Sequence, residues 1–335
     1  MQTICVTGAA GFIGFHLCRR LLQLGWTVIG LDSLNSYYDV KLKRDRLEGL
    51  NAERQFKFHH LDICDHHALE AIYSEQRFDY TIHLAAQAGV RYSLENPRAY
   101  TQNNVDGFLN ILECCRSFGC KHLVYASSSS VYGFNAKLPF STRDSVDHPV
   151  SLYAATKRVN ELMAHVYSHI YGLPTTGLRF FTVYGPWGRP DMAPFLFTKS
   201  ILEGKPIKVF NHGKLKRDFT YIDDIIDGVV PVIDQVPTAK AADLSALHPN
   251  ESWAPYRLYN IGNHHPVELL HFIELIERYT NRKAICVPTP MQAGDVPATY
   301  ADVSDLSEAT GFSPCTSIED GLREFVAWFR QYYSI

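Results

Sequence analysis

Short apolar runs alternate with longer amphipathic segments over the first half of the chain. The runs are rich in β-branched residues, which predicts strands, and apolar residues at three- and four-residue spacing predict helices between them. The predicted strands cover residues 2–7, 27–31, 56–60, 79–84, 121–126 and 174–180. The predicted helices cover residues 11–24, 65–75, 98–118 and 150–171. This alternation is typical of a parallel sheet that carries helices on both faces.

The pattern changes after about residue 185, where prolines become frequent and the segments become short and mixed. We therefore expect an α/β fold with two parts. A doubly wound parallel sheet of the Rossmann type would form domain 1–182, and a smaller mixed α/β domain would cover 183–335, with some segments returning to the first. Residues 237–256 lack a period and predict a surface loop, whereas residues 318–333 predict a packing helix.

Composition excludes several classes of function. The 335 residues are 46% hydrophobic and 20% charged, and their formal net charge of -3 provides no basic field for nucleic acid. The N-terminus runs directly into an apolar strand without the pattern of a secretion signal, and no apolar run approaches the ~20 residues that span a bilayer. We expect a cytoplasmic protein that binds neither nucleic acid nor membrane. Its 8 cysteines include no C-x-x-C pair, so no metal site is expected.

The first predicted strand runs into a turn that contains Gly8, Gly11 and Gly14 and precedes a helix. Unpaired N–H groups at a helix N-terminus bind anions, and glycines let a pyrophosphate approach the backbone. The second strand ends at Asp32, 18 residues after Gly14, where a carboxylate accepts hydrogen bonds from ribose hydroxyls and repels a 2′-phosphate. The sequence therefore predicts that the first domain binds NAD rather than NADP. Further residues expected around NAD are Phe12, Ile13, Asp62, Ile63, Leu84, Ala85 and Ala86.

A tyrosine and a lysine, Tyr153 and Lys157, lie four residues apart on a predicted helix and therefore share one face. A neighbouring ammonium stabilises a phenolate, which would let the tyrosine remove a proton from an alcohol as its hydride leaves. Four serines, residues 127–130, follow the strand 121–126 at the sheet edge where ligands bind. Such a pair often occurs by chance on a helix surface, but the glycine turn and the serines favour a catalytic site.

At these motifs the chain resembles the extended short-chain dehydrogenase/reductase family, and specifically its nucleotide-sugar epimerases and dehydratases. The matching segments are 7–14, 83–88, 125–133, 153–157, 179–186 and 217–224. The resemblance implies that Tyr153 is the catalytic base and that Lys157 holds the nicotinamide ribose and lowers the tyrosine pKa. It also implies that Ser128 hydrogen-bonds the reacting hydroxyl, with Ser127 and Ser129 as alternatives.

The residues after Ser128 indicate which reaction follows the shared oxidation at the sugar C4. Related dehydratases carry Asp and Glu there and decarboxylases carry a Glu, whereas this chain has Ser129 and Ser130. Dehydration is disfavoured because no carboxyl group would protonate a leaving hydroxyl. Epimerisation needs only rotation of the 4-keto sugar and return of the hydride to its other face, so NAD would stay bound.

The segment 182–193 resembles that of UDP-glucuronate 4-epimerases, in which an arginine that matches Arg189 faces the C6 carboxylate. A guanidinium fork suits a planar carboxylate. Glucose-type epimerases usually carry Asn at the position of Thr182, which we expect to contact the substrate. The alternative for Arg189 is a phosphate contact or a surface ion pair.

Looser resemblances suggest further substrate contacts from Arg91 and Ser129, with Arg217 at the UDP phosphates and Asp295 at the uridine ribose. Asp62 could instead cap a helix, and Asp295 could cap a turn. We expect an NAD-dependent epimerase that converts UDP-glucuronate to UDP-galacturonate reversibly through a 4-keto intermediate. The alternatives are a UDP-glucose 4-epimerase, a UDP-glucuronate decarboxylase and a non-catalytic NAD-sensing protein. The resemblance also implies a homodimer that pairs helices 98–118 and 150–171.

Overall fold

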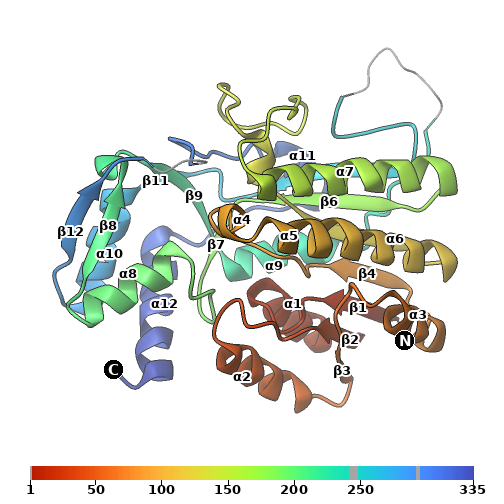
Figure 1. The fold of residues 1–335 in the computed structure, drawn as a ribbon, viewed down its shortest axis with the longest axis horizontal. Helices are drawn as coiled ribbons and strands as arrows, with labels where there is room; N and C mark the ends of the chain where they lie inside the picture. The colour runs from red at the N-terminus through yellow and green to blue at the C-terminus, as the bar shows by residue number, and fades with distance from the viewer. Residues whose placement is uncertain (1, 241–247, 292–294) are drawn as a thin grey trace.

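A seven-stranded sheet crosses the computed structural model, which describes residues 2–240, 248–291 and 295–335 (Figure 1). Its strands run in the order β10-β6-β5-β4-β1-β2-β3, and all neighbours are parallel. The first six strands therefore have the 3-2-1-4-5-6 order of a Rossmann sheet. This confirms the predicted α/β fold. The strands are β1 (Thr3–Thr7), β2 (Thr27–Asp32), β3 (Phe56–His60), β4 (Tyr80–His83), β5 (His122–Ser128), β6 (Thr175–Phe180) and β10 (Tyr256–Ile261).

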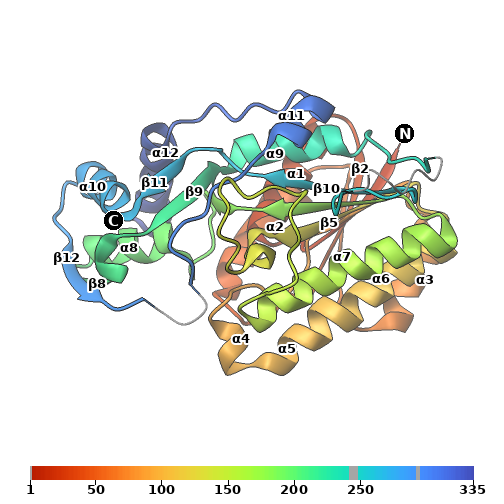
Figure 2. The ribbon, with the colours of Figure 1, turned by 90° about the horizontal axis from the view of Figure 1, so that it is seen from above.

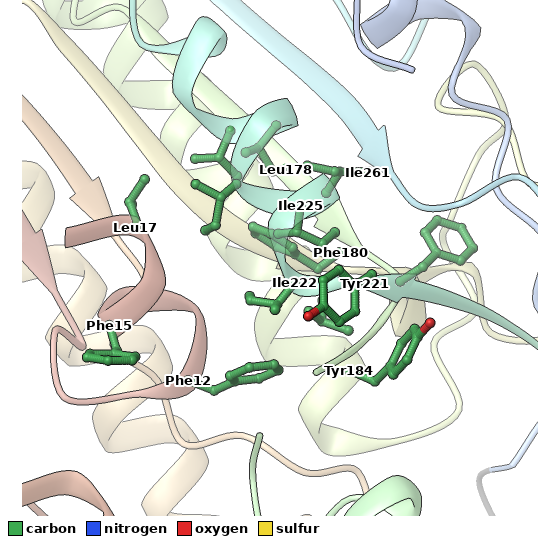
Figure 3. Packing of buried hydrophobic residues seen from close by; sticks show 14 of the residues in the cluster. Phe12, Phe15, Leu17, Leu178, Phe180, Tyr184, Tyr221, Ile222, Ile225 and Ile261 are labelled. Atoms are coloured by element: carbon green, nitrogen blue, oxygen red, sulfur yellow. The ribbon is translucent and has the colours of Figure 1, made fainter. Parts of the chain in front are cut away.

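Helices cover both faces of this sheet (Figure 2). One face packs against α1 and α9, and the other packs against α3, α6 and α7. The strands can be almost wholly apolar because both faces are buried. Figure 3 shows the packing between the sheet and the helices α1 and α9, where Phe12 and Leu17 of α1 lie beside Ile222 and Ile225 of α9. The helices are α1 (Phe12–Gln23), α2 (Val40–Asn51), α3 (His66–Gln76), α4 (Tyr92–Glu95), α5 (Pro97–Thr101), α6 (Gly107–Ser117), α7 (Leu152–Tyr171) and α9 (Ile222–Val232).

Smaller elements gather beyond the carboxyl ends of the large sheet, at the left of Figure 1. A three-stranded sheet has the order β11-β9-β7, and β12 pairs with β8. Because β10 returns from this part of the chain to pair with β6, the large sheet includes residues well beyond 182. These elements are β7 (Thr182–Tyr184), α8 (Ala193–Leu202), β8 (Pro206–Phe210), β9 (Lys216–Tyr221), β11 (Pro266–Glu268), α10 (Leu269–Thr280), β12 (Ile285–Thr289) and α12 (Ile318–Tyr333). Helix α11 (Ser304–Thr310) lies instead against α9 and β10 of the large sheet.

Two departures from the predicted elements lie near the carboxyl ends of the strands. Helix α2 was not predicted, because its buried face includes the charged residues Lys43 and Arg46. The single helix predicted over 98–118 is instead α5, a π-helical turn over Gln102–Asp106, and α6. In that turn, the side chain of Asn104 donates to the carbonyl oxygen of Gln87 at 3.0 Å and accepts from its N–H at 2.8 Å. The turn thus directs polar groups toward the chain that follows β4.

The predicted helix at 318–333 is confirmed by α12. The loop predicted over 237–256 is only partly described, since residues 241–247 lie outside the described residues, and β10 begins at Tyr256. No helix in the described part of the chain is both long and apolar enough to cross a membrane.

Candidate active site

The turn between β1 and α1 is shaped by its glycines. Gly8 has φ +73°, which L-residues rarely adopt, and a Cβ at Gly14 would stand 2.1 Å from the carbonyl oxygen of Gly8. Gly11 precedes α1 and makes no side-chain cap, so the first turn of the helix keeps its N–H groups for another partner. The turn therefore has the close backbone packing and the exposed donors that a pyrophosphate requires.

Asp32 lies at the end of β2, beside this turn. Its carboxylate accepts hydrogen bonds from the N–H groups of Ala10 at 3.2 Å and Leu34 at 2.8 Å, which hold it toward the cavity. Asp62 accepts from the N–H of Cys64 at 2.9 Å, whereas the cap of α3 is Asp65. The alternative that Asp62 caps the helix is therefore wrong.

Tyr153 and Lys157 lie one turn apart on α7, which begins after the capping residue Ser151. Lys157 is 2% exposed, and its ammonium donates to the carbonyl oxygen of Ala126 at 2.9 Å, which fixes it against the end of β5. Burial lowers the pKa of Lys157 to about 8. Burial also raises the pKa of Tyr153, although the hydroxyl of Ser128 and the positive charge of Arg189 partly offset this rise.

The neighbouring residues Ser127 and Ser128 at the end of β5 have different hydrogen-bond partners. The Ser127 hydroxyl donates to the Glu161 carboxylate at 2.6 Å, and both side chains are buried. Ser128 interacts with Tyr153 and donates to the Ser130 hydroxyl at 3.2 Å. Successive side chains of a strand point to opposite faces, so only one of these two hydroxyls faces the tyrosine.

Arg189 follows β7 in a turn closed by a hydrogen bond from the N–H of Met192 to its carbonyl oxygen at 3.2 Å. Its guanidinium is held by Asp191, with Nε donating to Oδ1 at 3.0 Å and Nη2 donating to Oδ2 at 2.5 Å. Burial opposes the charge of Arg189, but Asp191 more than offsets this and raises its pKa. Thr182 at the start of β7 lines the same cavity.

A second cationic group also lines the cavity. Asp295 lies between two arginines, at 3.6 Å from Arg91 and 4.0 Å from Arg217. The Arg91 guanidinium lies over the ring of Phe210, with its central carbon 4.9 Å from the ring centroid. Residues that are distant in sequence therefore form one patch in the cavity wall.

A single cavity of 960 Å³ brings the predicted residues together. Its volume is at the upper end of the range for ligand sites, as a dinucleotide and a second large ligand would require. The predicted residues that line it are Gly8, Gly11, Phe12, Ile13, Gly14, Asp32, Asp62, Ile63, Leu84, Ala85, Ala86, Arg91, Ser128, Ser129, Tyr153, Lys157, Thr182, Arg189, Arg217 and Asp295.

Among the other lining residues, which were not assigned a role from the sequence, Lys43, Asn35 and Tyr37 make polar contacts near the predicted site. Lys43 donates to the side-chain and main-chain oxygens of Asn35 at 2.8 and 2.9 Å beside Asp32, and Tyr37 donates to Asp191 at 3.1 Å. The capping residue Asp39 was a local signal for the start of α2, although the hydrophobic pattern after it was not. The contact between Tyr37 and Asp191 joins residues 154 positions apart, so no local pattern could indicate it.

The fold and the site define a nucleotide-binding α/β protein with a tyrosine–lysine pair at the carboxyl ends of its strands. Residues 4–262 match the model of the NAD dependent epimerase/dehydratase family. The chain belongs to this family.

Individual relatives extend over almost the whole chain. A probable UDP-glucuronate 4-epimerase of Rhizobium meliloti is 47% identical over 98% of this chain and 97% of its own length. UDP-glucuronate 4-epimerase 4 of Arabidopsis thaliana is also 47% identical, over 99% of this chain and 76% of its own length. A crystal structure of the Bacillus cereus UDP-glucuronic acid 4-epimerase with UDP-glucuronic acid and NAD is 33% identical, with a TM-score of 0.88 over 99% of this chain and 100% of that one.

Proposed function

We propose that this protein is a UDP-glucuronate 4-epimerase, which interconverts UDP-glucuronate and UDP-galacturonate through a 4-keto sugar with bound NAD. The observation that carries this proposal is the position of Arg189 in the same cavity as Tyr153, Lys157 and Ser128. A group that binds carboxylates thus lies next to a group that can remove a proton from an alcohol. The relatives with this activity that match nearly the whole chain support it further.

The glycine turn and Asp32 fit the two ends of an adenosine diphosphate group, because they offer free N–H donors and a fixed carboxylate acceptor. NAD bound there would supply the hydride acceptor for oxidation at the sugar C4 and the hydride donor for the reduction that follows. In our proposal, Lys157 holds the nicotinamide ribose. Phe12, Ile13, Asp62, Ile63, Leu84, Ala85 and Ala86 complete the cofactor site.

Tyr153 removes the proton from the O4 hydroxyl in the oxidation and returns it in the reduction. Ser128 donates a hydrogen bond to that oxygen, since Ser127 is already bonded to Glu161. Burial disfavours the phenolate form of Tyr153, whereas the Ser128 hydroxyl and the Arg189 charge favour it. In our proposal the ammonium of Lys157 adds to these two groups. Ser129 and Ser130 offer no carboxyl group for expelling a hydroxyl, so the 4-keto sugar is reduced again.

The substrate spans the rest of the cavity. Arg189 and Thr182 bind the C6 carboxylate, with Arg91 and Ser129 as further contacts, and Arg217 binds the diphosphate. Asp295 binds the uridine ribose. Two arginines near Asp295 suit a ligand that brings two phosphate charges into this end of the cavity.

The active form in this proposal is a cytoplasmic homodimer. Leu162, Val166 and Ile170 are 52%, 46% and 62% exposed and recur every four residues on α7, which gives an apolar stripe on one helix face. Pairing of α6 and α7 with a second copy would bury this stripe. Sedimentation of the native protein at micromolar concentration should give twice the 38.0 kDa chain mass, and a single-chain mass would contradict the dimer.

The activity is tested by incubating the purified protein with UDP-glucuronate, without added cofactor, and resolving the products by chromatography. UDP-galacturonate is the expected product, and its formation without added NAD requires a resident cofactor. UDP-xylose as the main product would instead indicate a decarboxylase, and turnover of UDP-glucose alone would indicate a glucose epimerase.

The matched control is Tyr153→Phe, which removes only the phenolic oxygen. This variant should retain NAD and bind UDP-glucuronate but form product about 100- to 10,000-fold more slowly. Bound NAD without turnover in the native protein would favour the NAD-sensing alternative.

A further inference from the structure

Asp191 occupies one of the two paired-donor edges of the Arg189 guanidinium. Its two oxygens accept from Nε and Nη2, which are the parallel donors of a guanidinium fork, at 3.0 and 2.5 Å. The two side chains are 22% and 26% exposed, and both line the cavity that contains Tyr153. The pair therefore faces the ligand space.

A tyrosine from the other side of the cavity supports Asp191. The hydroxyl of Tyr37 donates to Oδ2 of Asp191 at 3.1 Å, and its ring lies 4.9 Å from that of Tyr92. Gly89 leaves room for this hydroxyl, because a Cβ there would stand 2.5 Å from it. Tyr37 thus gives Asp191 a hydrogen-bond partner that does not depend on Arg189.

We infer that Asp191 is a specificity-determining residue that holds Arg189 in the absence of substrate and exchanges with the carboxylate of the incoming uronate. This inference rests on the proposed function of Arg189. A second carboxylate beside Asp191 would meet a like charge in a partly buried site, so it replaces Asp191 at the fork and does not join it. Tyr37 keeps its bond to the displaced carboxylate.

The exchange has a consequence for substrate choice. A neutral sugar leaves the pair between Arg189 and Asp191 intact and gains nothing from the guanidinium. The carboxylate of a uronate gains the hydrogen bonds of the Arg189 guanidinium, but it must first displace Asp191. Asp191 therefore lowers the affinity for the uronate and leaves the affinity for the neutral sugar unchanged.

The test is Asp191→Asn, which removes the charge and keeps the shape. Binding of UDP-glucuronate and UDP-glucose is measured by calorimetry on NAD-loaded protein that also carries Tyr153→Phe, so that neither ligand is converted. The ratio of the two affinities should shift about tenfold toward UDP-glucuronate, since a hydrogen bond to a charged group is worth roughly that factor. Asp191→Glu keeps the charge and should shift the ratio less than Asp191→Asn.

Asp295→Asn is the matched control because it removes the same charge from the same cavity, at the end proposed for UDP. It should alter both affinities together and leave their ratio unchanged. An unchanged or reduced preference for UDP-glucuronate in Asp191→Asn would overturn the inference, because Asp191 would then orient Arg189 without competing. Failure of the proposed function is distinguishable, since the native protein would then not convert UDP-glucuronate at all.

Melting temperature and NAD content identify a variant that fails to fold. In that case Asp191→Ala provides the second measurement, since it also removes the carboxylate that occupies the fork. The preference for UDP-glucuronate should then increase severalfold. An unchanged preference in Asp191→Ala would also contradict the exchange.

Discussion

Glu161 and Arg179 form an ion pair with both side chains fully buried behind the serines of β5. Arg179 donates from Nε and Nη2 to the two carboxylate oxygens at 2.8 and 2.9 Å, and Ser127 and Arg158 donate to the same group at 2.6 and 3.0 Å. Glu161→Gln would leave the Arg179 charge uncompensated. Removing one partner of a buried pair costs about 3–5 kcal/mol, so the free energy of unfolding should decrease by that amount.

The assay is urea unfolding of the NAD-loaded protein, followed by circular dichroism. Glu203→Gln is the matched control, because the same substitution breaks a surface pair with Lys205 at 2.8 Å. Its effect should stay within about 0.5 kcal/mol, as for other exposed pairs. A loss below about 1 kcal/mol in Glu161→Gln would refute the reasoning, since the buried arginine would then have found another partner or water.

The contribution of Glu161 to the free energy of unfolding should also depend on pH. Burial raises the pKa of Glu161, but the charge and hydrogen bonds of Arg179 outweigh it, and the net pKa is below the ordinary value. The contribution of the carboxylate is therefore complete above its unfolded pKa of about 4.3 and is lost as the pH falls through the lower folded pKa. The stability difference between native protein and Glu161→Gln should be constant at neutral pH and narrow only in acid.

Three further changes test the site. Tyr153→Phe should reduce kcat about 100- to 10,000-fold with NAD still bound, as expected for loss of the acid–base group, and near-native turnover would exclude this role. Gly14→Ala should abolish NAD retention because its Cβ would overlap the carbonyl oxygen of Gly8, whereas Gly49→Ala, whose Cβ would meet only the Phe15 ring at 4.0 Å, should keep NAD. Retained NAD is measured by its release when the protein is unfolded. Arg189→Ala should release more UDP-pentose, because a 4-keto uronate whose carboxylate is not fixed loses carbon dioxide readily, and chromatography would show unchanged product ratios if Arg189 has no such role.

Six of the seven strands of the large sheet could be predicted from the sequence because both faces of the sheet are buried, whereas β10 was not predicted. These six strands are short apolar runs between amphipathic helices, and the predicted strand ends lie within two residues of the observed ones. Helix α2 could not be found in this way. Its buried positions include Lys43 and Arg46. Charged residues normally indicate a solvent-exposed segment, but Arg46 is 0% exposed.

The residues of the candidate site were predictable where each follows a strand or shares a helix turn. Gly8, Asp32 and Tyr153 belong to local motifs whose spacing indicates a shared edge or face. The patch around Asp295 depends on approaches between Arg91, Arg217 and residues up to 204 positions away, so only the resemblance indicated it. The bond from Tyr37 to Asp191 had no such indication.

Arg46 holds the glycine turn after β1 at a fixed position relative to the turn that contains Trp187 and Arg189. One of its nitrogens, Nη1, donates to the carbonyl oxygen of Ala10 in the glycine turn at 2.8 Å, and Nη2 donates to that of Trp187 at 2.5 Å. Because Trp187 lies two residues before Arg189, a single buried guanidinium ties the turn proposed for the pyrophosphate to the turn proposed for the uronate. Hydride transfer requires the reacting carbons of the sugar and the nicotinamide to lie about 3–3.5 Å apart, and a misplacement of about 1 Å lowers the rate strongly. Arg46 is therefore one of the buried charged residues that break the apolar pattern of α2, and it also links the two turns of the proposed site.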